Sequence, residues 1–85
     1  MHNVTIQISR DSIKTAGTFA TRDEAEVAAA NIVRDALLHG IYVDSVFPLI
    51  AEGRVQGFNV TYQSDATTMK IRIHAGNSAA TRFLG

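Results

Sequence analysis

The sequence has no cysteine, only one proline and no net charge over its 85 residues. Without cysteine, the chain can form no disulfide framework and can carry out no thiol chemistry. Zero net charge argues against strong non-specific binding to nucleic acid or to an anionic membrane, because both need a positive field. It leaves open a local basic patch. The composition also makes self-association easier, since a protein without net charge repels its own copies only weakly.

Long apolar runs are absent as well. No stretch approaches the ~20 residues that a membrane-spanning helix needs. Met1 is followed by a polar, strand-like segment in place of a charged and then apolar leader, so we expect no signal peptide, no membrane association and a cytoplasmic protein.

The residue patterns of known catalytic and metal sites are also missing. His2, His39 and His74 lie on different predicted elements and have no acidic or cysteine companion at the spacing of metal ligands. The GRVQG segment at 53–57 lacks the following helix and the lysine of a phosphate-binding loop. No serine stands in a G-x-S-x-G context. We therefore expect no enzyme, no metal and no cofactor, although a site assembled from distant residues would escape this test.

One segment, residues 21–40, has every feature of a helix. Thr21 and Glu24 form the T-x-x-E pattern of a capping box. His39 lies at the negative end of the helix dipole, and Gly40 is the expected left-handed residue after the last turn. We expect a helix over about 21–39.

The helix has two distinct faces. The predicted buried face is mostly alanine, which lets a helix lie close against a sheet, and consists of Ala25, Ala28, Ala29, Ile32, Val33 and Ala36. On the opposite face, a stripe points outward and consists of Val27, Asn31, Arg34 and Leu38. This stripe is either an ordinary surface with scattered apolar residues or a contact for a partner.

The rest of the chain is predicted to form strands. Residues 2–9 alternate cleanly between apolar and polar, and residues 13–19 either return as a weaker strand with a bulge near Gly17 or form a loop over the core. After the helix, strands are expected at 41–51, where Pro48 marks an edge, a bulge or an end, and at 54–63 and 67–75. Tight turns at 52–53 and 64–66 separate these strands. The inward residues of the last two strands are Phe58, Val60, Tyr62, Met69, Ile71 and Ile73.

These elements predict an α+β fold of a single domain, residues 1–85, in the order β(β)αβββ. We expect a two-layer sandwich in which one helix packs on a four- or five-stranded antiparallel sheet. Residues 76–85 form either a short terminal turn or a frayed tail. Phe83 and Leu84 indicate that the tail docks on its own core or on a neighbour.

A basic row, Lys70, Arg72 and His74, points outward from the last predicted strand. A nucleic-acid-binding sheet needs aromatic side chains on the same face to stack on bases. Phe58 and Tyr62 are predicted to point to the core, so this row is expected to be a solvated strand face without a stacking platform.

In its overall plan, with an acid-capped and alanine-rich helix of the type TRDEAEVAAANIV against an antiparallel sheet, the chain resembles the small phage-encoded anti-CRISPR inhibitors. The resemblance covers the architecture of the whole chain, includes no diagnostic motif and assigns no functional residue. It implies a non-enzymatic inhibitor in the host cytoplasm that docks on a host nuclease complex and blocks target-DNA access or nuclease recruitment.

Two functions follow as hypotheses. The first is a protein-binding module, with a host nucleoprotein complex or a second copy of the chain as partner, since an unpaired edge strand can pair with another chain. Its candidate contacts are the stripe Val27, Asn31, Arg34 and Leu38, the edge near Tyr42 and Asp44, and the tail residues Phe83 and Leu84. The alternative is a weak nucleic-acid-binding domain that uses Lys70, Arg72 and His74.

Overall fold

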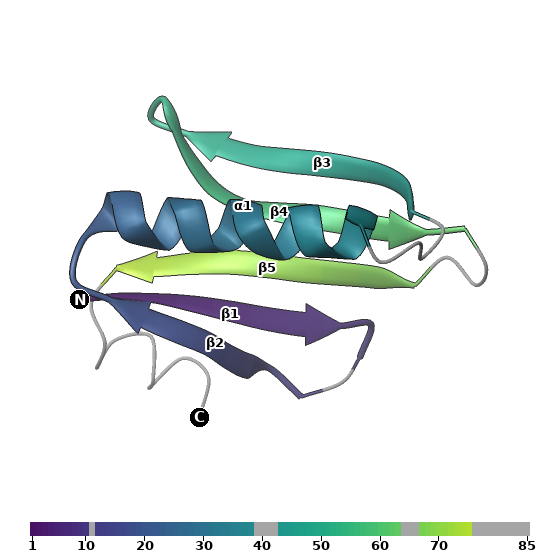
Figure 1. Cartoon of the computed structure of the whole chain (residues 1–85), viewed down its shortest axis with the longest axis horizontal. Coiled ribbons are helices and arrows are strands. Elements are labelled where there is room, and N and C mark those ends of the chain that lie inside the picture. The colour runs from purple at the N-terminus through teal and green to yellow at the C-terminus, as the bar shows by residue number, and fades with distance from the viewer. Residues whose placement is uncertain (11, 39–42, 64–66, 76–85) are drawn as a thin grey trace.

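Five segments pair as the strands of one antiparallel sheet, and a single helix packs on one face of it (Figure 1). The computed structural model describes residues 1–10, 12–38, 43–63 and 67–75. Its elements are β1 (His2–Ile8), β2 (Lys14–Phe19), α1 (Arg22–Leu38), β3 (Val43–Ala51), β4 (Arg54–Tyr62) and β5 (Thr68–Ala75). The predicted two-layer α+β fold is confirmed in its five-stranded form.

The strand order is β2-β1-β5-β4-β3. The first and last strands of the described chain, β1 and β5, are therefore neighbours in the middle of the sheet. Residues 13–19 were predicted to form either a strand or a loop, and they contain β2, which lies at one edge of the sheet. Strand β3 forms the other edge (Figure 1). Pro48 lies within β3, so of the predicted alternatives, an edge, a bulge or an end of a strand, the edge strand is confirmed.

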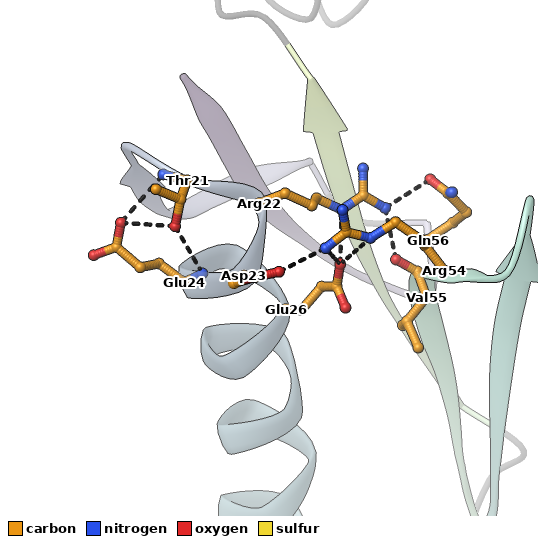
Figure 2. Close-up of polar contacts among 8 residues, drawn as sticks. All are labelled: Thr21, Arg22, Asp23, Glu24, Glu26, Arg54, Val55 and Gln56. Atoms are coloured by element: carbon orange, nitrogen blue, oxygen red, sulfur yellow. Dashed lines mark hydrogen bonds and ion pairs between the residues drawn. The ribbon is translucent and has the colours of Figure 1, made fainter.

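The helix begins where the capping box was predicted. The hydroxyl of Thr21 accepts from the Glu24 amide at 3.2 Å, and the Glu24 carboxylate accepts from the Thr21 amide at 3.1 Å (Figure 2). These bonds satisfy two amides that the first turn would otherwise leave unpaired.

The core lies between the helix and the sheet. From the helix, Ala25, Ala29 and Val33 are buried, and the other members of the predicted face are half-buried at its margin. The sheet contributes Val4, Val60, Met69, Ile71 and Ile73. The short alanine side chains let α1 contact every strand of the sheet. The inward assignments for β4 and β5 are thus confirmed.

Three irregularities interrupt the strand pairing. Ala16 is an extra residue in β2, next to the predicted bulge at Gly17. In the β3–β4 pair, Asp44 is extra on β3 and Gln56 is extra on β4. The turn that joins these two strands has positive φ at both Glu52 (55°) and Gly53 (74°), as in a type I′ hairpin.

Several predicted features fall outside the described residues: His39, the Gly40 cap, the turn at 64–66 and the tail at 76–85. In the part of the chain that is described, no helix is long and apolar enough to cross a membrane.

Candidate functional site

The predicted helix stripe is exposed. Val27 is 60% and Leu38 72% exposed, and Asn31 and Arg34 are exposed beside them. Only the first half of the stripe borders a hollow. Val27 and Asn31, with Ala28, line a groove of about 400 Å³ that also includes Phe19 at the end of β2. Arg34 and Leu38 do not line it.

Two carboxylates border this groove, and both are bonded within the chain. Glu24 belongs to the capping box. Asp23 accepts a hydrogen bond from Arg54 at 2.6 Å. The groove therefore offers an apolar floor and wall, without a free acidic group from either of these residues.

The bond to Asp23 is part of a polar cluster that ties the start of α1 to the β3–β4 hairpin (Figure 2). Arg54 also donates to Glu26 at 2.9 Å, and Arg22 lies 3.3 Å from the same carboxylate. Arg22 donates in addition to the carbonyl of Val55 at 2.6 Å. The hydrogen bonds that Arg54 donates to Asp23 and Glu26 raise its pKa. Because Arg54 is on the surface, this cluster orients the hairpin more than it stabilises the fold.

The other face of the sheet, which α1 does not cover, holds the predicted basic row. Arg72 lies between Thr5 of β1 and Gly57 of β4. Its guanidinium donates to the carbonyls of Phe58 (3.2 Å) and Ile71 (3.0 Å) and to the side chain of Asn59 (2.9 Å). Burial lowers the pKa of Arg72.

His74 is also held by its surroundings. Its Nε2 lies 2.9 Å from the hydroxyl of Thr5, a residue only 3% exposed. Burial, and secondly the positive charge of Arg72, lower the pKa of His74. The expectation of a solvated face therefore holds for Lys70, which is exposed, and is wrong for Arg72 and His74, which are half-buried. Cross-strand partners, which a single strand's pattern does not reveal, account for the difference.

The basic row borders a second hollow. A cavity of about 220 Å³ is lined by Thr5, Gln7, Ile13, Lys70, Arg72 and His74. The described acidic side chains lie elsewhere: on α1, at the β3 bulge and in the β3–β4 turn. Within the described residues, the lining of this cavity is thus basic, polar and apolar, without a carboxylate.

An aromatic side chain lies on this face, contrary to expectation. Phe58 and Tyr62 pack on the core as predicted. Phe47 of β3, however, pairs with Asn59, whose side chain holds Arg72, and is 64% exposed. Side chains of directly paired residues share a face of the sheet. Phe47 therefore lies on the same face as the basic row.

The bulge at Gln56 explains why this aromatic was missed. A regular hairpin around the turn at Glu52 and Gly53 would pair Phe47 with Phe58 and direct it to the core. The extra residue moves the partner to Asn59 and so moves Phe47 to the other face. The segment 41–51 carries apolar residues in both alternating sets, so its pattern could not reveal this shift.

None of the other residues predicted to contact a partner is among the described residues that line either hollow. Asp44 is exposed at a bulge of the β3 edge, whereas Tyr42, Phe83 and Leu84 lie outside the described residues. Within the described ranges, no three histidine or acidic side chains gather where they could hold a metal ion.

Comparison of the chain with family models, with curated proteins and with solved structures finds no match.

Proposed function

We propose that this chain is a non-enzymatic protein-binding module that docks through the groove between α1 and β2. The observation that carries the proposal is the groove of about 400 Å³ beside Val27, an apolar side chain that is 60% exposed. Exposed apolar surface next to a hollow is typical of places where proteins bind partners.

The groove suits an apolar anchor from a partner protein. Phe19 and Ala28 are half-buried in the groove lining, and Val27 and Asn31 complete it. Interfaces derive most of their affinity from a few side chains that fill such hollows. Asp23 is already paired with Arg54, so a partner need not supply a positive charge for it.

A finer proposal concerns the identity of the partner. The overall plan that the chain shares with the anti-CRISPR inhibitors, an alanine-rich helix on an antiparallel sheet, supports a CRISPR nuclease complex as the first partner to test. In that role the chain would act in the host cytoplasm by occupying a surface needed for target-DNA access or nuclease recruitment. No residue of this chain is assigned by that resemblance.

The test is a pull-down with the tagged chain, from bacterial lysate and with purified CRISPR nuclease complexes, each with and without added nuclease. Val27→Glu places a charge in the groove and should abolish capture of a protein partner. Ile50→Glu is the matched control, because Ile50 is 64% exposed on β3, away from the groove lining. Far-UV circular dichroism checks that both variants keep the fold.

The pair of variants separates the candidate surfaces. Loss of capture in Val27→Glu alone supports the groove. Loss in Ile50→Glu alone moves the contact to the β3 edge and contradicts the groove. Capture that both variants retain contradicts both surfaces. If the chain captures another protein but no purified CRISPR complex, the proposed identity of the partner is contradicted, and the proposed groove is not.

A second candidate function is binding of single-stranded nucleic acid on the uncovered sheet face. The observation that favours it is Phe47, which adds an exposed aromatic to the face of Lys70, Arg72 and His74. Base stacking on aromatics combined with basic side chains is the usual way to hold a single strand. Such binding should weaken steeply with salt. Capture that nuclease treatment removes would support this candidate over the first.

A further inference from the structure

Arg72 is a half-buried cation without a counter-charge among the described residues. It donates to two backbone carbonyls and one amide oxygen, all uncharged. The other two arginines that make described side-chain bonds, Arg22 and Arg54, both contact Glu26. Removing a charge from water costs free energy unless an opposite charge compensates it. An unpaired cation in this position indicates a place for an anion.

The structure around Arg72 holds its guanidinium in one position. Three acceptors on β4 and β5 fix it. Gly57 makes room for the side chain, because a β-carbon there would lie 3.2 Å from Cδ of Arg72. A cation that is held in place before binding loses little conformational freedom when a ligand arrives.

Two further groups border the same cavity on β5. Lys70 and His74 lie two residues to either side of Arg72 and share its face. Their spacing along the strand is therefore about 6.6–6.8 Å from Arg72 on each side. Thr5 contributes a hydroxyl, and Ile13 contributes an apolar wall.

We propose that this cavity, over β1 and β5, binds a phosphate group. Two permanent positive charges, on Lys70 and Arg72, match a phosphate monoester, which carries about −1.5 to −2 at neutral pH. Arginine suits phosphate because it donates charge-assisted hydrogen bonds. Within the chain, Nη1 of Arg72 donates twice and Nη2 once, which leaves Nε and one hydrogen of Nη2 for the ligand. A carboxylate would compensate only one of the two cations.

The phosphate can come from two sources, a nucleotide with a terminal phosphate or the backbone of a single strand. The site does not depend on the protein-binding groove, which lies between α1 and β2. In binding of single-stranded nucleic acid, the second candidate function, the phosphate site would contact the backbone. Phe47 lies two strands away on the same face. A free nucleotide would instead place its sugar and base against Ile13.

The experiment is a titration of the folded chain, followed by amide chemical shifts in ¹H–¹⁵N spectra. The probes are inorganic phosphate, adenosine 5′-monophosphate and a single-stranded oligonucleotide without terminal phosphate. We expect saturable shifts centred on Thr5, Lys70, Arg72 and His74. Lys70→Met should weaken binding about tenfold, as expected for loss of one charge-assisted hydrogen bond. Lys14→Met removes the same charge from β2, outside the cavity lining, and should leave binding unchanged.

Arg72→Gln should abolish binding. If Arg72→Gln fails to fold, the comparison of Lys70→Met with Lys14→Met still decides the test. Tightest binding of the monophosphate supports the site with a nucleotide as ligand. Tightest binding of the oligonucleotide supports the site with a strand as ligand. The proposal is overturned if no probe gives saturable shifts at these four residues, or if Lys14→Met weakens binding as much as Lys70→Met. Neither result would affect the capture of a protein by the groove.

Discussion

Gly57 and Ile71 approach so closely across β4 and β5 that a β-carbon at position 57 would overlap the carbonyl oxygen of Ile71. The glycine is needed for this approach rather than for a turn, since it lies within a strand. The same absence of a side chain lets Arg72 extend over β4 to the carbonyl of Phe58. One glycine thus serves both the pairing of two interior strands and the position of the Arg72 guanidinium.

Gly57→Ala should therefore destabilise the protein. Inserting a methyl group where there is no room costs about 1–3 kcal/mol of unfolding free energy. Urea denaturation of the two proteins measures this difference. Gly53→Asn is the control, because Gly53 has a φ of 74°, which asparagine tolerates, and no atom within 4 Å of the added β-carbon. Equal stability of Gly57→Ala and the parent would contradict the close approach.

The free edge of β3 lacks a donor at Pro48. Tyr62 directs its amide to Thr67, on the β5 side, at 2.9 Å. Along an antiparallel strand, the backbone amide and carbonyl groups of successive residues point alternately to the two neighbouring strands. Those of Asn59 and Thr61 therefore point to β3. Their partners Phe47 and Ser45 consequently face β4, and Pro48 faces outward. An edge that offers one donor fewer is a poorer template for another strand.

Pro48→Val should increase self-association. It restores one outward amide, and a hydrogen bond contributes about 0.5–1.5 kcal/mol, roughly two- to tenfold in the association constant. Sedimentation equilibrium at several concentrations measures this constant. Leu49→Val is the control, because Leu49 pairs with Gly57 and faces β4. If Pro48→Val associates no more than Leu49→Val, the proline does not protect the edge.

His74 makes the stability of the protein depend on pH. Because burial and Arg72 lower its pKa below the usual 6.5, the folded protein binds this proton less readily than the unfolded chain does. The contribution of His74 to stability is therefore present above pH 6.5 and is lost as the pH falls through its folded pKa. The imidazole protons of His74, followed by NMR against pH, should titrate below pH 6.5.

Arg72→Gln removes the positive neighbour and should move the pKa of His74 upward, toward the usual value, while burial keeps part of the shift. Arg34→Gln removes an equal charge from the outward face of α1 and serves as the control. A pKa at or above 6.5 in the parent protein would contradict the half-buried position of His74. The same titration in the presence of phosphate should move the pKa upward, because an anion favours the protonated ring.

Local patterns predicted the features that depend on neighbours along the chain. The Thr21–Glu24 capping box, the alanine-rich buried face and the alternation in β1, β4 and β5 all arise from contacts a few residues apart or from one repeating period. The helix was therefore correct within one or two residues at its start, and the inward side chains of β4 and β5 were correct. The exposure of Val27 was also expected.

Which strands pair, and in which register, was decided by the tertiary structure. Backbone hydrogen bonds are alike in every strand, so the sequence does not reveal that β1 lies beside β5 or that Thr5 meets His74. A single extra residue at Gln56 moves Phe47 from the core side to the uncovered face. Local periodicity was enough to predict the elements and most of their buried faces. Only the fold placed Phe47 on the face of Thr5, Asn59 and Arg72 and brought Thr5 to His74, because long-range register joins residues that no local pattern relates.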